Sequence, residues 1–243
     1  MREKIIKIVK ENWRLWYGLY VFIYFPWFFW LEKKITITSP GIHILNTSLD
    51  EAIPFIEWFI IPYTLWALYV VATVVVFYFK ANDIEYRHLA ISLISGMSIA
   101  LFICMIFPNG LTLRPDSVSD SILGQMVAKL YTSDTSTNVF PSIHVLNSLI
   151  VTYAIVKSEL VADKKYFFIK AGSIILCILI CLSTIFLKQH CLYDVIGGIL
   201  LFWLLTNLIY NVDYAKIKSK IEIKLNERRK AKEYIISNNK KDY

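Results

Sequence analysis

Long apolar stretches are the feature that most restricts how this chain can fold. An α-helix rises about 1.5 Å per residue, so roughly 20 apolar residues cross the hydrocarbon core of a bilayer. Six stretches approach that length, at residues 13–31, 54–79, 89–107, 142–156, 166–187 and 192–210. Because 56% of the 243 residues are hydrophobic, a soluble domain is not expected. The sequence predicts an all-α, polytopic membrane bundle with six transmembrane helices.

The whole chain, residues 1–243, is predicted to form a single integral-membrane domain, because neither an internal repeat nor a low-complexity linker divides it. The first apolar stretch is long, aromatic and without a small-residue cleavage site, so we expect it to be retained rather than removed as a signal peptide. The basic tail, residues 213–243, carries Ile217, Ile221 and Leu225 at helical spacing. An interfacial helix on anionic lipid and a solvated tail are both compatible with this pattern.

The distribution of basic residues predicts the orientation. With the N-terminus in the cytoplasm, 21 of the 26 Lys and Arg residues lie on the cytoplasmic side. The other five are Lys33, Lys34, Arg114, Lys129 and Lys188. Cytoplasmic loops of membrane proteins are enriched in Lys and Arg, so both termini are predicted to be cytoplasmic. The net charge of +7 is then explained by the membrane, and no nucleic-acid partner is expected.

Two histidines lie at the predicted extracytoplasmic ends of spans, where an ionisable side chain is costly and usually functional. His144 follows Pro141 and Ser142, a pattern typical of a helix start. The free backbone N–H groups of such a terminus can bind a phosphate. A simple helix cap followed by an interfacial histidine is the alternative interpretation.

His190 and Asp194 are four residues apart, which places them on one face of a helix. A carboxylate in that position can accept the imidazole N–H and leave the other ring nitrogen as a nucleophile or base. Arg114, in the preceding outer loop, carries a guanidinium that can hold phosphate oxygens through two hydrogen bonds. These features predict a phosphate-handling site on the extracytoplasmic face.

The order of these motifs resembles the type 2 phosphatidic acid phosphatase superfamily, a family of six-span membrane enzymes that act on lipid phosphates. The matching motifs are Arg114-Pro115, Pro141-Ser142-Ile143-His144, and Ser183 followed by His190 and Asp194. Together they extend over roughly residues 114–194, and the hydropathy extends the resemblance over most of the chain.

The resemblance implies a role for each matching residue. His190 is expected to be the nucleophile that forms a phosphohistidine, oriented by Asp194. His144 is expected to protonate the leaving oxygen and then to activate the acceptor. The residues expected to hold phosphoryl oxygens are Arg114, Ser142 and Ser183. Such a mechanism needs no metal or cofactor; a metal site formed by the two histidines and Asp194 is the alternative.

Two positions depart from the family pattern. Phe107 replaces a usual lysine seven residues before the arginine, and Thr184 replaces a usual arginine after the serine. A site with few cations tolerates a singly charged phosphodiester more readily than a monoester that approaches two charges. Lys188 is a candidate to restore one positive charge at the phosphate, or else reaches toward lipid phosphate at the membrane surface.

Some details resemble the branch that contains inositol phosphorylceramide synthases, namely Ile143 within the histidine motif, the Lys188-Gln189-His190 run and the segment from Ile53 to Tyr63. Three functions remain open. The first is a lipid phosphatase of the cell membrane that acts on a phospholipid or polyprenyl phosphate at the extracytoplasmic face. The second is a lipid head-group phosphotransferase with an alcohol acceptor. The third is a non-enzymatic membrane binding protein. The sequence indicates neither the lipid nor the oligomeric state.

Overall fold

The structure, a computed structural model, describes residues 13–211, 219, 223 and 225. It divides into two compact units, Met1–Ile209 and Tyr210–Tyr243. In the second unit Ile223 and Leu225 are helical and more than half exposed. The expected interfacial helix of the basic tail also depends on Ile217 and Ile221, which lie outside the described residues.

Most of the described residues are helical. The α-helices are α2 Trp13–Gly18, α3 Val21–Lys34, α4 Ser48–Ala52, α5 Ile60–Lys80, α6 Asp83–Ile106, α7 Ile122–Ser133, α8 Ile143–Lys157, α9 Phe167–Phe186 and α10 Leu192–Tyr210. The short elements are the 3-10 turns η1 Glu57–Phe59, η2 Glu159–Val161 and η3 Lys164–Tyr166, and the strands β1 His43–Ile44 and β2 Asn109–Gly110.

The prediction of a helical fold with apolar spans is confirmed in part. Within the described part of the chain, four segments are long and apolar enough to cross a membrane: Glu57–Lys80, Asp83–Ile106, Lys164–Phe186 and Leu192–Tyr210. The predicted span 142–156 appears as α8, which has only 15 residues. The predicted span 13–31 is interrupted by a turn between α2 and α3. Gly18 is the last residue of α2, and the conformational freedom of glycine weakens a helix at such a point.

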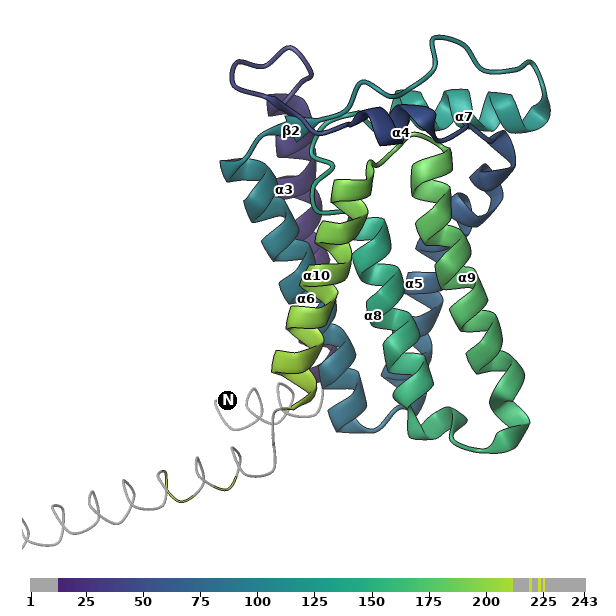
Figure 1. The fold of residues 1–243 in the computed structure, drawn as a ribbon. Helices are drawn as coiled ribbons and strands as arrows, with labels where there is room; N and C mark the ends of the chain where they lie inside the picture. The colour runs from purple at the N-terminus through teal and green to yellow at the C-terminus, as the bar shows by residue number, and fades with distance from the viewer. Residues whose placement is uncertain (1–12, 212–218, 220–222, 224, 226–243) are drawn as a thin grey trace, which may run out of the picture. The chain divides into compact units, whose positions relative to one another are not determined.

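Helix α8 forms the centre of the first unit. It packs against α5, α6 and α9, and its side chains Val145, Leu146, Ile150 and Val151 are fully buried. Figure 1 shows the long helices side by side, with α4 and α7 lying across one end. Large apolar side chains on the outer helices are exposed, as expected for surfaces that face lipid; examples are Leu68, Phe168 and Trp203.

The loops at the end of the bundle that carries α4 and α7 are tied together by short strand contacts. Strands β1 and β2 pair in parallel, with His43 opposite Asn109 and Ile44 opposite Gly110. Gly110 also forms an antiparallel bridge with Thr137. The segments that follow α3 and α6 and precede α8 therefore meet at one place, and the first turns of α8 and α10 lie toward the same end of the bundle (Figure 1).

Candidate active site

His190 lies in the short connection between α9 and α10, directly before the first turn of α10. Its Nδ1 is 3.2 Å from Oδ2 of Asp194, a fully buried carboxylate that also accepts the Cys191 backbone N–H at 2.9 Å. The backbone N–H groups of Gln189 and His190 both donate to the Thr184 carbonyl at 3.0 Å. Hydrogen bonds to Oδ2 of Asp194 and to the Thr184 carbonyl thus fix the position of His190.

His144 faces His190 from the first turn of α8. Its Nδ1 is 3.4 Å from Nε2 of His190, so the structure brings His144, His190 and Asp194 into one chain of contacts. The rings of Trp66 and Tyr63 lie 4.1 and 4.7 Å from the His144 ring, between centroids. These aromatic contacts hold the imidazole in a single orientation.

A backbone hydrogen bond joins the two helices that carry the histidines. The Ser142 N–H donates to the Asp194 carbonyl at 3.0 Å. Gly198 makes this close approach feasible, because a Cβ at that position would lie 2.9 Å from the Ser142 carbonyl oxygen. The first turns of α8 and α10 are therefore in direct contact, as small residues permit at helix interfaces.

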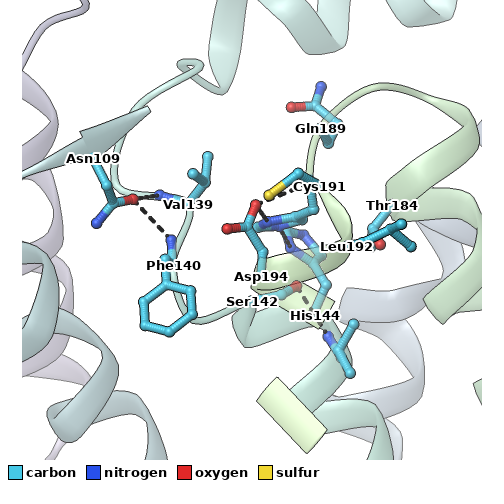
Figure 2. A network of polar contacts seen from close by, with 12 residues as sticks. Asn109, Val139, Phe140, Ser142, His144, Thr184, Gln189, Cys191, Leu192 and Asp194 are labelled. Atoms are coloured by element: carbon cyan, nitrogen blue, oxygen red, sulfur yellow. Dashed lines mark hydrogen bonds and ion pairs between the residues drawn. The ribbon is translucent and has the colours of Figure 1, made fainter. Parts of the chain in front are cut away.

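Asn109 is a buried residue of this network that the sequence analysis did not identify. Its Oδ1 accepts the backbone N–H groups of Val139 and Phe140, each at 2.9 Å, and its Nδ2 donates to the Phe107 carbonyl at 2.7 Å. The amide fixes the loop segment that leads into the Pro-Ser-x-His motif (Figure 2). An Asn-Gly pair after an apolar span was the available signal, although it is also common in ordinary turns.

The expected phosphate-binding side chains make protein contacts. The hydroxyl of Ser142 caps α8 by accepting the Val145 N–H at 3.4 Å, and the hydroxyl of Ser183 donates to the Ile180 carbonyl at 2.6 Å. Both serines are fully buried. Their predicted role at the phosphate remains an expectation.

Arg114 joins the end of α7 to the residue before His190. Its guanidinium donates to the carbonyls of Tyr131, Asp134 and Thr135 and, at 2.7 Å, to Oε1 of Gln189. Burial lowers the pKa of this guanidinium, although Asp134 opposes the effect. In this arrangement Arg114 positions Gln189; its contact with a phosphate remains a prediction.

Helix α4 anchors the connection between α9 and α10. Oδ1 of Asp50, a buried carboxylate, accepts the Leu192 N–H at 2.8 Å and so caps α10, while its other oxygen forms a capping box with Thr47. The Lys188 ammonium donates to the carbonyls of Asp50 and Ile53. Burial lowers the pKa of Lys188. The Thr47-to-Asp50 spacing was a visible signal for this anchor.

Replacing Asp50 with alanine is expected to lower the free energy of unfolding by about 1–3 kcal/mol, because the Leu192 N–H loses its acceptor. Thermal unfolding of the purified protein in detergent measures this effect. Glu51→Ala is the matched control, since Glu51 is the exposed neighbour of the buried Asp50. Equal melting temperatures for the two variants would contradict the anchoring role of α4.

A cavity of about 440 Å³ opens beside the two histidines. At its polar end it is lined by Glu32, Thr135, Asn138, Gln189, His144 and His190. Farther along, Tyr24, Phe25, Val70, Val71 and Met97 line both this cavity and a second, apolar one of about 370 Å³ between α3, α5 and α6. The histidines thus lie at the polar end of a long and mostly apolar space.

Two other chemistries receive no support from the site. Burial raises the pKa of the Cys191 thiol to about 12, so this cysteine is not a thiolate nucleophile at neutral pH. Across the described residues, no group of three or more His, Cys, Asp and Glu side chains is arranged to hold a metal ion. The alternative metal site formed by His144, His190 and Asp194 therefore has no geometric support.

Comparison with known proteins identifies the family. The model of the PAP2 superfamily matches residues 85–218, more than half of the chain. The chain belongs to the PAP2 superfamily. Members of the PAP2 superfamily are phosphatases or phosphotransferases that act on lipids. The matched region contains Arg114, both histidines and Asp194 but neither Glu32 nor Asp50. A search of curated proteins found no match, and the resemblance to the branch of inositol phosphorylceramide synthases remains an expectation.

Proposed function

We propose that this PAP2-superfamily protein is an integral-membrane lipid phosphatase that works through a phosphohistidine at His190, without a metal ion. The observation that carries the proposal is the buried sequence of contacts from Asp194 to His190 to His144 at the polar end of the cavity. A nucleophile, the group that orients it and a second imidazole for proton transfer are the parts that this reaction needs.

The first chemical step transfers the phosphoryl group to His190. Because Asp194 accepts the Nδ1–H, the lone pair is left on Nε2, which faces His144. Attack of Nε2 on phosphorus forms an N–P bond and breaks the P–O bond to the lipid alcohol. His144 gives its proton to the departing oxygen, so the lipid leaves as a neutral alcohol.

The second step returns the enzyme to its starting state. His144 takes a proton from a water molecule, whose oxygen attacks phosphorus and displaces Nε2 of His190. The N–P bond breaks, inorganic phosphate is released and His144 is protonated again. The net reaction consumes one lipid phosphate and one water, and it yields one lipid alcohol and one phosphate.

The proposed topology has six membrane crossings, cytoplasmic termini and an extracytoplasmic active site in the cell membrane. The charge distribution supports it. The exposed residues His43 and Asp163 lie on loops that the proposal assigns to opposite sides. A membrane-impermeant maleimide added to intact cells is expected to label a cysteine at 43 but not one at 163. Labelling at 163 but not at 43 would show that the protein has the opposite orientation in the membrane.

The apolar continuation of the cavity supports a lipid substrate, since an acyl or polyprenyl chain can occupy it while the phosphate lies at the histidines. Val71→Trp, at the junction of the two cavities, is expected to lower kcat/KM for a long-chain lipid phosphate by about tenfold. Hydrolysis of soluble p-nitrophenyl phosphate should stay unchanged. Val76→Trp is the control, because Val76 is half-exposed and lines neither cavity. Equal losses of kcat/KM on both substrates would exclude a role for the apolar cavity in binding the lipid chain.

A head-group phosphotransferase is the second candidate, and the scarcity of cations favours it. Among the described residues that line the cavity beside the histidines there is no Lys or Arg. Phe107 and Thr184 replace two cations of the family, and the Lys188 ammonium is bonded to main-chain carbonyls. Such a site suits a singly charged phosphodiester.

Incubation with a panel of lipid phosphates, diphosphates and phosphodiesters distinguishes the candidates. The phosphatase is expected to release free phosphate from a lipid phosphate. Formation of a lipid with a new head group, without release of free phosphate, would show that the protein catalyses transfer and not hydrolysis. If neither product forms with any lipid, the enzymatic proposal fails and a binding protein remains.

A further inference from the structure

Glu32 brings a carboxylate to the cavity from the last turn of α3. Its Oε1 accepts a hydrogen bond from Nδ2 of Asn138 at 2.8 Å, and its Oε2 accepts one from the Thr135 hydroxyl. All three side chains line the same cavity as His144 and His190. A carboxylate is an unusual neighbour for a phosphate, because it repels the phosphoryl oxygens.

Several buried polar atoms of residues that line the cavity have no partner. Oδ1 of Asn147 and Nε2 of Gln189 are unpaired, and their side chains are only 1% and 3% exposed. Oδ1 of Asn138 is also buried and unpaired. All three side chains line the cavity. Buried polar atoms are normally hydrogen-bonded, so unpaired ones around a cavity indicate that a polar ligand completes them.

The chemistry of these atoms defines the ligand. Two amide oxygens and the Glu32 carboxylate accept hydrogen bonds, whereas Nε2 of Gln189 donates one. A hydroxyl group can both donate and accept, while an ammonium group only donates. Asp134 also lines the cavity, and no cation is present among its described lining residues. The site therefore attracts hydrogen-bond donors and disfavours a phosphate group with two negative charges.

We propose that Glu32, Asn138 and Asn147 form a subsite for a hydroxyl-bearing head group esterified to the substrate phosphate. The inference rests on the proposed attack by His190 and develops the second candidate function, for which the donor is a phosphodiester lipid whose head group carries free hydroxyls. The N–P bond forms as the P–O bond to the lipid alcohol breaks and His144 protonates that alcohol. The phosphorylated head group then stays on His190 until an acceptor hydroxyl or water displaces it. The head group binds at the Glu32 end of the cavity, the phosphate at the histidines and the lipid chain in the apolar continuation.

The test is Glu32→Gln, which removes the charge but keeps the size and a hydrogen-bonding oxygen for Thr135. Three lipids with identical acyl chains are compared: phosphatidylglycerol, phosphatidylmethanol and phosphatidic acid. The variant is expected to lower kcat/KM for phosphatidylglycerol by about tenfold. Phosphatidylmethanol, a diester without a free hydroxyl, should be unaffected, and phosphatidic acid should react equally well or faster because a repulsive charge is gone.

Glu57→Gln is the matched control. Glu57 makes the same kind of contacts, with Ser119 and Ser121, but does not line the cavity, so the three rates should not change. The subsite is refuted if Glu32→Gln lowers all three rates equally, which indicates a structural role, or if it changes none of them.

Binding provides a readout that does not depend on turnover. In a His190→Ala background, the affinity for phosphatidylglycerol is expected to fall about tenfold on adding Glu32→Gln, while that for phosphatidylmethanol stays constant. If the wild-type protein turns over no lipid, the proposed function fails but this measurement still decides the subsite. Equal affinities with and without Glu32→Gln would overturn it.

Discussion

Replacing His190 with alanine is expected to reduce turnover of the lipid substrate by a factor on the order of 10⁴ or more, because alanine has no nitrogen to form the proposed N–P bond. The His190 imidazole is only 6% exposed and is bonded on both sides, so a water molecule cannot take its place in the same geometry. Rapid quenching with ³²P-labelled substrate should trap an acid-labile, alkali-stable label on the wild-type protein and none on the variant.

His43→Ala is the matched control for this experiment. His43 is exposed and stacks on Phe107, with a centroid distance of 4.3 Å, and it does not line the cavity beside His190. Its removal should leave both the rate and the covalent label unchanged. Full activity of His190→Ala would refute the phosphohistidine mechanism.

Asp194→Asn is expected to produce the second largest loss, about 10²- to 10⁴-fold in kcat. The carboxylate receives both the Nδ1–H of His190 and the Cys191 N–H, and it is completely buried. Both bonds end on Oδ2, so the asparagine oxygen can still accept them, but the neutral amide no longer stabilises positive charge on the imidazole. Steady-state kinetics on the purified variant measure the loss.

Asp163→Asn makes the same chemical change at an exposed position, where Asp163 pairs with Lys165. It should retain full activity. Melting temperatures of both variants separate a catalytic loss from unfolding. An Asp194→Asn protein that keeps kcat within about twofold of wild type would exclude an orienting role for the carboxylate.

Hydropathy was sufficient to predict the long helices, because a lipid-facing helix must be apolar over its whole length. It could not locate the break between α2 and α3, which is a local turn within an apolar run. It also could not distinguish α8, a short buried helix, from a full span. The hydrophobic signal is the same for a helix surrounded by protein and for one surrounded by lipid.

The sequence could single out the histidines and Asp194 because they belong to short motifs, and the structure brings the three side chains together. Two of the residues that were missed, Glu32 and Asp50, have partners far along the chain: Asn138 is 106 residues from Glu32, and Leu192 is 142 residues from Asp50. The periodicity of a sequence does not reveal contacts between residues so far apart. The side chain of Arg114 was predicted to face a phosphate, and its observed carbonyl contacts could not be foreseen because they depend on how α7 ends.

The hydrogen bond between the Ser142 N–H and the Asp194 carbonyl involves only main-chain atoms, which every amino acid except proline supplies at the donor position. The separation of the two imidazoles is therefore encoded by backbone path and by one small residue, Gly198, more than by the side chains around them. The cavity walls, in contrast, consist of side chains such as Phe25, Val71 and Met97. Substitutions in the cavity walls can therefore change which molecules fit the cavity while the two imidazoles keep their spacing.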